Sequence, residues 1–510
     1  MHSARSAVLS SVLASGVLVG CALAYPFSDV APDETLPTTP VDSGSDSAIG
    51  AADVVVPAND AASDASVKSG DVRWVTVLDQ GIADATASTW GDVRGHPDGG
   101  FVATMSFATG DAGTSTDIAL VRLDANGSVS WKKTFGGAGD EEAHTVAVDA
   151  AGNIWLSGAS RTNPSLFTNV ANPNARRRPF AAKLDANGNL LFAAAIDVSG
   201  ITDSSCHGIA IGAAATYLGC RFDGTLSVTT TNDDVVQRTS KSSTSDLLIG
   251  RIDPANGKFV WNDVYGGDAS EVLWELLPIG DHVFAAGWFT SSSFSPTNRS
   301  RVGTGENAFA IELDGTTALP SWIRTWGQAG SGNFVRGLSA ASGSDGSLVI
   351  GGDFRGYFDF GAAGQSTALL RSAWWAFLDR DKQGLETSLV AIAGATSSLV
   401  RGITIANNGD AIATGELQAT AAPTVAGHAL GYAADGRSTG YVVRASKSGK
   451  VVYTRSWLSG TGAVLPRRVN IGSGGEAVIF GTFTGRVDFG DGIPRTAGTN
   501  GSVFIVALEP

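Results

Sequence analysis

A short phrase that recurs along the chain constrains its fold more than any other feature. LDANGSVSW begins at Leu123, LDANGNLLF at Leu184 and IDPANGKFVW at Ile252. In each copy, runs of alternating apolar and polar residues flank an Asn-Gly turn, and Asn and Gly tolerate the left-handed backbone of tight hairpin turns. Alternation with a period of two is typical of β-strands. The phrase therefore predicts one antiparallel hairpin used repeatedly.

The copies return about every 60 residues, the spacing of a repeat architecture. The register is marked by a residue on the last strand of each unit, aromatic in all copies but one: Trp74, Trp131, Phe192, Trp261, Trp322, Ser388 and Tyr453. A second signal, the strand that opens each unit, also occurs in seven copies, which begin at Trp90, Ala143, Cys206, Val272, Phe334, Val400 and Pro466. Both signals give seven units of four short strands, here named a, b, c and d in chain order.

Seven such units predict an all-β chain, a seven-bladed β-propeller of four-stranded antiparallel blades, because radial repetition protects sheet edges that an isolated blade would expose. Residues 71–510 would form it. The stretch DVRWVTVL, from Asp71, is a strand d with no blade before it. SVFIVALEP, from Ser502, is a strand c with no strand d after it. We therefore expect the N-terminal strand to complete the last blade.

DIALVRLDANGSVSWKKTFGG and FAAKLDANGNLLF resemble the bacterial β-propeller repeats of exported and lipid-anchored proteins, over about residues 71–510. The resemblance implies the fold and implies no particular function, since such folds host enzymes, adhesins and scaffolds alike.

The first 70 residues are predicted to form a signal peptide followed by a disordered tether. Residues 1–20 resemble a lipoprotein signal peptide, with Leu18-Val19-Gly20 before Cys21, the predicted lipidation site; the alternative is an ordinary signal peptide cut after Ala22 or Ala24. Residues 21–70 are an acidic Pro, Ser, Ala and Asp-rich segment with too little apolar surface to fold. We expect export and a lipid anchor. Ala22, directly after the cysteine, resembles the sorting signal that directs lipoproteins to the bacterial outer membrane. Whether the chain faces the periplasm or the exterior is left open.

Candidate binding residues lie on the opening strand of each unit. Aligning its seven copies places a cation at the same position in five of them: His144, His207, Arg336, Arg401 and Arg467. Arginine binds carboxylate, phosphate or sulfate through a planar fork of donors, so these residues predict an acidic ligand at the mouth of a central channel. The alternative is salt bridging between repeats, to acids such as Glu142 and Glu271. The b–c loops are long, so we predict that ligands bind at the end of the propeller that carries these loops.

Two further features have more local interpretations. Cys206 and Cys220 lie equidistant from the turn of one hairpin, which predicts a disulfide; a metal site with His207 would lack a fourth ligand. Arg176, Arg177 and Arg178 form a basic run in a b–c loop, where solvation is the expected state.

The net charge of −14 argues against nucleic acid as a partner. The sequence has no G-x-S-x-G, H-E-x-x-H or P-loop motif. We therefore expect a monomeric, non-enzymatic envelope lipoprotein that binds or scaffolds an envelope protein or anionic glycan, contacts the membrane through its lipid only, and uses no cofactor or metal. The alternatives are an assembly scaffold of the outer membrane and an envelope enzyme, either glycan-cleaving or quinoprotein-like; the stretch from Asp253 to Trp261 resembles the tryptophan-docking repeat of quinoproteins.

Overall fold

The computed structural model describes residues 54–55, 68–78, 91–109, 115–137, 139–161, 176–199, 204–213, 215–242, 244–294, 299–330, 332–359 and 365–510. All of them belong to one compact unit, residues 49–510. The predicted signal peptide and Cys21 lie outside the described residues. Two residues of the predicted tether, β1 (Val54–Val55), pair with β32 (Tyr432–Ala433). No helix among the described residues is long and apolar enough to cross a membrane.

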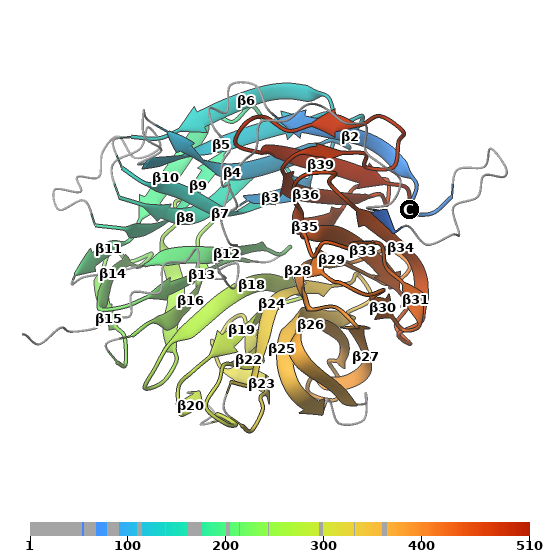
Figure 1. The fold of residues 1–510 in the computed structure, drawn as a ribbon. Coiled ribbons are helices and arrows are strands. Elements are labelled where there is room, and N and C mark those ends of the chain that lie inside the picture. The colour runs from blue at the N-terminus through green and yellow to red at the C-terminus, as the bar shows by residue number, and fades with distance from the viewer. Residues whose placement is uncertain are drawn as a thin grey trace, which may run out of the picture. The chain divides into compact units, whose positions relative to one another are not determined.

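The described part of the chain is all-β, and its principal strands pair into seven four-stranded antiparallel arrays (Figure 1). In pairing order, the first array is β3 (Gly91–Gly95), β4 (Phe101–Thr109), β5 (Ser115–Leu123) and β6 (Val129–Phe135); the second is β7 (Glu141–Val148), β8 (Ile154–Ser160), β9 (Arg178–Leu184) and β10 (Leu190–Ala195); the third is β12 (Ser205–Ile211), β13 (Thr216–Phe222), β16 (Asp246–Ile252) and β17 (Phe259–Tyr265).

The fourth array is β18 (Glu271–Ile279), β19 (His282–Phe289), β22 (Asn307–Asp314) and β23 (Pro320–Trp326); the fifth is β24 (Phe334–Ser342), β25 (Leu348–Asp359), β26 (Gln365–Asp379) and β27 (Leu385–Ala393); the sixth is β28 (Ser397–Ile405), β29 (Ala411–Gln418), β33 (Thr439–Ala445) and β34 (Val451–Trp457); the seventh is β35 (Val464–Ile471), β36 (Ala477–Phe483), β39 (Ser502–Leu508) and β2 (Val72–Leu78). A single parallel bridge, Arg371 to Ser397, joins the fifth and sixth arrays into one larger sheet.

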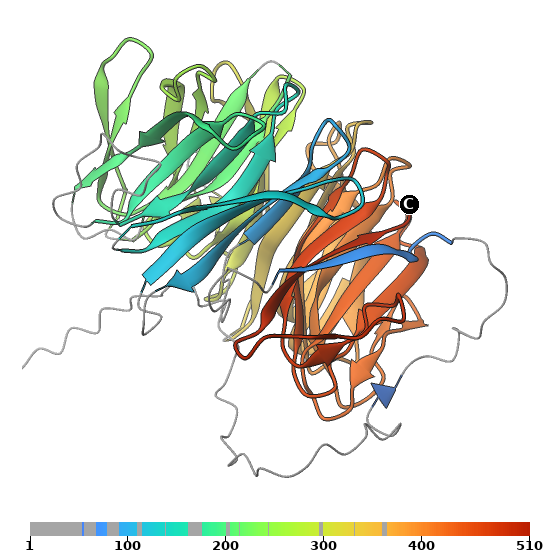
Figure 2. The ribbon, with the colours of Figure 1, turned by 90° about the horizontal axis from the view of Figure 1, so that it is seen from above.

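The first strands of successive arrays lie against one another. Each contacts the first strand of the next array, and β35 contacts both β28 and β3. Figure 1 shows blue β3 beside red β35, and Figure 2 shows blue β2 along the red strands of the last array. β2 pairs with β39 from Val72 to Leu78. The two ends of the described repeat region are thus held in one array.

Every array has the same two ends. We call the end that carries the short first-to-second and third-to-fourth strand turns the turn face, and the opposite end the loop face. The predicted long loop from Asp223 to Ser245 holds an ordered hairpin, β14 (Thr225–Thr229) and β15 (Val235–Thr239), which pairs with β11 (Asp197–Ser199). Short pairs also occur between β20 (Ser293–Phe294) and β21 (Arg299–Ser300), β30 (Thr424–Val425) and β31 (His428–Ala429), and β37 (Arg486–Val487) and β38 (Arg495–Thr496).

The recurrent Asn-Gly phrase has a packing explanation. Gly188 has a φ of +72°, and a Cβ there would lie 2.8 Å from the ring of Trp131 on the preceding array. Gly127 on Trp74 and Gly384 on Trp322 repeat the arrangement. The turn glycine therefore meets two demands, a left-handed backbone and room for the neighbouring array's aromatic ring. Trp131 and its counterparts connect neighbouring arrays, as the sequence predicts.

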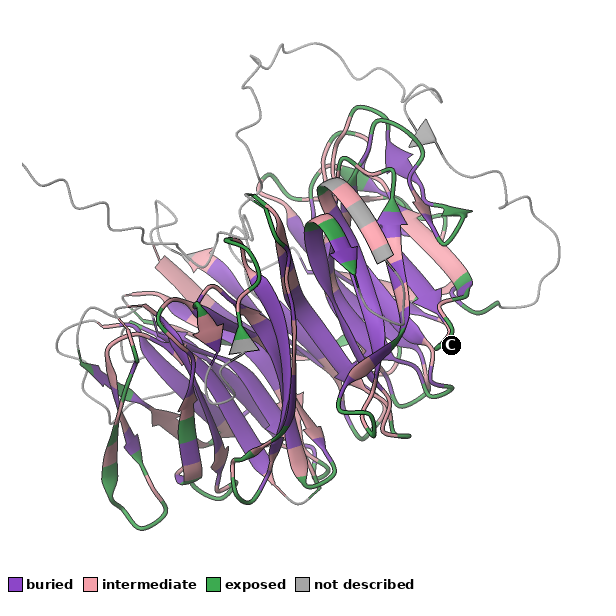
Figure 3. Ribbon diagram, turned by 90° about the horizontal axis from the view of Figure 1, so that it is seen from below, coloured by how far each residue is buried: buried purple, intermediate pink, exposed green. Residues whose placement is uncertain are grey.

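The apolar core lies between arrays. Ile118 and Leu120 of the first array pack with Val146, Leu156 and Phe180 of the second, and similar clusters recur between later neighbours. Figure 3 shows buried residues along the strands and exposed residues at the connections. Each array thus buries both of its faces, which favours near-continuous apolar runs such as SVFIVAL.

Candidate functional site

The first strands share a β-bulge, which decides where the predicted site residues lie. In six of the seven arrays, one extra residue interrupts the pairing with the second strand. The extra residues are His144, His207, Trp274, Leu338, Arg401 and Arg467. Bulges re-aim side chains and are frequent at functional sites. Four of the five predicted cations occupy this position. The alignment of the first strand of the fifth array is wrong, because Leu338 holds the bulge and Arg336 lies two residues earlier.

Glycine on the second strand makes the bulge possible. A Cβ on Gly352 would lie 1.9 Å from the carbonyl oxygen of Arg336, and a Cβ on Gly415 would lie 2.0 Å from that of Leu399. Gly158 and Gly287 have the same environment. Because no side chain fits there, the glycine allows the first strand's backbone to come close and the bulged residue to turn.

The arginine cluster comprises Arg336, Arg371, Arg401 and Arg467 with the acids Asp353 and Glu416. Arg336 Nε and Nη2 donate to the two carboxylate oxygens of Asp353 at 3.1 and 2.7 Å, and Arg371 Nε donates to Asp353 Oδ2. Arg401 Nη2 donates to Glu416 Oε1 at 3.0 Å. Both acids lie on the second strand, one residue after the bulge glycine. The ion pairs therefore form within an array, and the acids upstream of the first strand do not supply them.

Hydrogen-bonding capacity remains unused inside the arginine cluster. Arg371 Nη2, Arg401 Nε, Arg467 Nε and Glu416 Oε2 are buried and have no hydrogen-bond partner among the described residues. Among the described residues, the cluster holds four guanidinium groups and two carboxylates. Buried donors without partners are costly, and an anion between them would satisfy both their hydrogen bonds and their charge.

The charges of the arginine cluster are strongly coupled. Burial alone would raise the pKa of Asp353, but Arg336 and Arg371 outweigh it and lower that pKa. The pKa of Glu416 is likewise lowered, because Arg401 and Arg467 outweigh its burial. Burial lowers the pKa of Arg401 to about 10, although Glu416 acts in the opposite direction. Both acids are therefore ionised at neutral pH.

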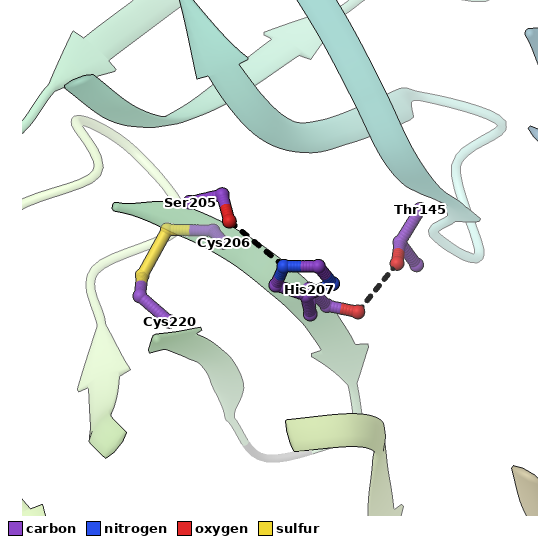
Figure 4. Close-up of a disulfide and its surroundings, with 5 residues drawn as sticks. All are labelled: Thr145, Ser205, Cys206, His207 and Cys220. Atoms are coloured by element: carbon purple, nitrogen blue, oxygen red, sulfur yellow. Dashed lines mark hydrogen bonds between the residues drawn. A yellow bond between two sulfur atoms is a disulfide. The ribbon is translucent and has the colours of Figure 1, made fainter. Parts of the chain in front are cut away.

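The two predicted histidines form a separate cluster. Their rings lie 4.2 Å apart. His144 Nε2 is 2.9 Å from Glu142 Oε2, and Arg177 Nη2 donates to the same oxygen at 2.5 Å. His207 Nε2 lies 2.8 Å from Ser205 Oγ, and Thr145 Oγ1 donates to its carbonyl oxygen at 2.7 Å (Figure 4). Burial and the neighbouring His144 hold the pKa of His207 well below its usual value, so it stays neutral.

Two arginines of the basic run are buried. Arg177 pairs with Glu142, and Arg178 Nη1 donates to Asp197 Oδ1 at 3.2 Å; the two residues are 5% and 3% exposed. The expectation of a solvated loop is wrong for both, because ion pairs draw them into the sheet edge. Cys206 and Cys220 lie directly opposite each other and are joined by a disulfide, which takes the place of the bulge glycine in the third array.

Four charged residues form an axial network on the first strands, beyond the bulges. Arg94 Nη2 lies 3.2 Å from Asp92 Oδ2 and 3.6 Å from Glu275 Oε1. Arg468 Nη1 lies 3.6 Å from Glu275 Oε2 and donates to the carbonyl oxygen of Arg401 at 3.4 Å. Burial raises the pKa of Glu275, and Arg468 and Arg94 offset the rise only in part. Arg468 therefore links a carboxyl with a raised pKa to the arginine cluster.

A second kind of acid site lies between the third and fourth arrays, at the loop face. Asp246 and Glu271 are fully buried, and Ser291 Oγ donates to Glu271 Oε1. Burial and the hydrogen bond with Asp246 raise the pKa of Glu271 to about 9. Burial also raises the pKa of Asp246, in contrast with Asp353 and Glu416, whose pKa values are lowered by arginines.

Sequence reasoning missed Asp353, Arg371, Glu416 and Glu275. A signal for two of them exists: aligning the second strands on their glycine puts Asp353 and Glu416 in the same column. Among the described residues, no three His, Cys, Asp or Glu side chains form a group that could hold a metal ion.

No protein-family model matches the chain, and no curated protein matches its sequence. The similar solved structures include three from enzymes. Puromycin hydrolase has a TM-score of 0.32 and 11% identity, over 82% of this chain and 62% of that one. A mutant of the NanB sialidase from Streptococcus pneumoniae has a TM-score of 0.38 and 9% identity, over 87% and 71%. Pyrococcus horikoshii acylaminoacyl peptidase has a TM-score of 0.33 and 9% identity, over 78% and 58%.

These comparisons correct one expectation. The sequence favoured a non-enzymatic binding or scaffolding module, whereas the similar structures are a hydrolase, a sialidase and a peptidase. The chain spans less than two thirds of the hydrolase and of the peptidase. At these TM-scores, no substrate or catalytic residue is carried over to this chain.

Proposed function

We propose that residues 71–510 form a seven-bladed β-propeller that carries an enzyme acting on an anionic glycan. Seven four-stranded arrays, the contact of β35 with β3 and the pairing of β2 with β39 support seven blades and a closure by the N-terminal strand. In such a propeller, the first strands line the axis. The arginine cluster then opens toward the loop face.

The observation that carries the function is the arginine cluster with its unused donors. Arg371 Nη2, Arg401 Nε and Arg467 Nε are N–H groups that a planar anion can bridge. Asp353 fixes two of the guanidinium groups, so little conformational entropy is lost when an anion binds. A carboxylate of an acidic sugar fits this arrangement of charge and donors.

The chemistry rests on two carboxyls whose pKa values move in opposite directions. The pKa of Glu416 is lowered and one of its oxygens has no partner among the described residues, whereas burial raises the pKa of Glu275. Glycoside hydrolysis uses such a pair, an acid that protonates the leaving oxygen and a carboxylate that attacks the anomeric carbon or activates water. The proposed reaction adds water across a glycosidic bond, with Glu275 as the acid and Glu416 as the carboxylate.

The cellular setting is a second part of the proposal. Cys21 would be acylated, and residues 22–70 would tether the enzyme to the outer membrane of a bacterium. Cell-envelope and extracellular polysaccharides that carry uronic acids are substrates within reach of such an anchor.

The test is release of reducing ends by the full chain from a uronate-containing polysaccharide and from its carboxyl-reduced form. We expect cleavage of the acidic form only. Arg467→Gln should lower kcat/KM about tenfold or more, since a charged hydrogen bond is lost. Arg324→Gln, on the outer strand β23, is the matched control.

Glu275→Gln should lower kcat and leave the KM for the acidic polysaccharide within about twofold, because it alters a reacting group rather than the arginines. Glu416→Gln should lower kcat and also change KM, because it removes the charge that Arg401 contacts. A folded wild-type protein that releases no reducing ends from any acidic polysaccharide would overturn the enzyme. Equal rates on the carboxyl-reduced form would overturn the assigned role of the arginines.

A further inference from the structure

A cavity of about 580 Å³ opens at the turn face, at the other end of the first strands from the arginine cluster. The first strands of the first, second, third, fourth and seventh arrays line it, together with the turn after β28. Sequence reasoning expected binding at the loop face only. The volume lies within the range of small-molecule sites.

The lining of the cavity has two chemically distinct sides. One side is aliphatic and comes from β7, β12 and β18, with Val148, Ile209, Ile211, Leu277 and Pro278. The other side is polar. It comes from β3, β35 and three turns, and it presents Arg94, His96, Asn407, Asn470 and Ser473. A ligand that fills the cavity must therefore offer both an apolar part and groups that form hydrogen bonds.

The charges in the wall are already compensated. Arg94 binds Asp92 and Glu275, and its Nε donates to the carbonyl oxygen of Val146 at 3.2 Å. Asp149 accepts backbone hydrogen bonds within its turn and lies 3.4 Å from Lys183 Nζ. The wall thus holds fixed dipoles and paired ions without an excess of either sign, unlike the arginine cluster. An uncharged ligand avoids the cost of breaking these pairs.

The unused hydrogen-bonding groups are amides and a hydroxyl. Among the described residues, no hydrogen bond involves the side chains of Asn407, Asn470 or Ser473, and each is at least partly exposed. His96, by contrast, is held by Asp98 at 2.7 Å and by the carbonyl oxygen of Gly152 at 3.2 Å. Two amides and a hydroxyl opposite an aliphatic wall suit ligand hydroxyl and amide groups on one side and a methyl group on the other.

We propose that the turn-face cavity binds an uncharged sugar that carries an N-acyl group. Asn407, Asn470 and Ser473 hydrogen-bond its hydroxyl and amide groups, and the acyl methyl packs on Ile209, Ile211 and Pro278. The cavity has room for roughly two such sugar units, as sites of this volume hold drug-sized ligands. The inference does not depend on the loop-face activity, since no residue is shared by the two sites.

The test is calorimetric titration of the full chain with di-N-acetylchitobiose, and with its de-N-acetylated, cationic counterpart as the comparison ligand. The wild type should bind the acetylated sugar at least about tenfold more tightly, because the cationic form loses the methyl contact and must desolvate two ammonium groups. Asn407→Ala combined with Asn470→Ala should weaken binding about tenfold or more. The control is Asn187→Ala, at an exposed third-to-fourth strand turn outside the cavity.

A second variant tests the location. Ser473→Trp places a large side chain at the exposed rim, where it can fill the cavity without replacing a core residue, and should abolish binding while leaving the thermal midpoint within about 2 °C of wild type. Absence of wild-type binding, equal affinity for the two sugars, or binding that survives in both variants would each overturn the proposal. Turnover of acidic polysaccharide should be unchanged in Ser473→Trp. The proposal for the turn-face cavity can therefore fail or succeed independently of the proposed activity at the arginine cluster.

Discussion

The same seven first strands end in two different environments. Toward the loop face, their bulges present Arg401, Arg467, His144 and His207, and the second strands add buried acids. Toward the turn face, they carry aliphatic residues and amides around a cavity with compensated charge. One repeated backbone thus provides an end with excess positive charge and an end with none.

The difference follows from the backbone conformation at each end of the first strands. The turn face is made of short turns, many of them with a glycine of positive φ such as Gly127, Gly152 or Gly188, so most units are alike there. At the loop face the bulge frees one residue per strand from pairing, and that residue varies between histidine, tryptophan, leucine and arginine. Function at the loop face can therefore differ between arrays without altering the fold.

The largest expected effect tests the buried acids of the loop face. Asp353→Asn removes the charge that both Arg336 and Arg371 contact, and leaves two buried guanidinium groups without a counter-ion. We expect a loss of about 3–5 kcal/mol in the free energy of unfolding, the usual result of removing one partner of a buried ion pair. Chemical denaturation followed by tryptophan fluorescence measures it.

The matched control on the turn face is Asp149→Asn. This carboxylate is also held by hydrogen bonds and by Lys183, but it is part of a turn at the protein surface, so the expected loss is about 1 kcal/mol. Similar losses for the two variants would contradict the contrast between a buried, charge-coupled loop face and a compensated turn face.

Much of the fold follows from sequence because each unit repeats one local solution. The Asn-Gly turn and the aromatic residue four positions later predict the hairpin, and the structure adds that the turn glycine Gly188 packs on Trp131 of the preceding array. The pairing of Cys206 with Cys220 follows from their equal distance from one turn. TLSVT and VVQRT of the hairpin β14–β15 also alternate with a period of two, a strand signal within the region predicted as a long loop.

The candidate site was less predictable because it depends on contacts between units. Arg336 was aligned two residues away from its true register, since a bulge shifts the pairing without leaving a length signal. Single acids such as Asp353 and Glu416 look like exposed polar positions of an alternating strand. Only the approach of Arg371 from the third strand shows that Asp353 is buried and doubly paired.

A pH titration of stability sharpens the comparison within the loop face. Glu271 has a pKa of about 9 in the folded chain against an ordinary value of 4.5, so between these pH values the folded state holds a proton that the unfolded state has released. Stability from this group is complete below pH 4.5 and falls as the pH rises to about 9, by at most about 1.4 kcal/mol per pH unit.

Glu271→Gln should flatten this decline and leave the variant more stable than wild type near pH 9. Asp353 and Glu416, whose pKa values are lowered, act in the opposite direction, and their stabilisation is lost only as the solution becomes acidic. Thermal unfolding midpoints between pH 5 and about 9.5 would measure both effects. A wild-type midpoint independent of pH over this interval would contradict a protonated Asp246–Glu271 pair.

The smallest expected effect is that of salt on binding, and it separates the two ends most directly. Raising ionic strength from roughly 0.05 to 0.5 M shortens the Debye length from about 14 to about 4 Å. An acidic oligosaccharide at the arginine cluster should then bind a few-fold more weakly, because the added salt screens part of its attraction to the guanidinium groups. Di-N-acetylchitobiose at the turn-face cavity should keep its affinity, since Arg94 and Asp149 are already paired and the ligand carries no charge. Titrations of both ligands at both salt concentrations test this. Equal salt dependence for the two ligands would mean that charge does not distinguish the two ends.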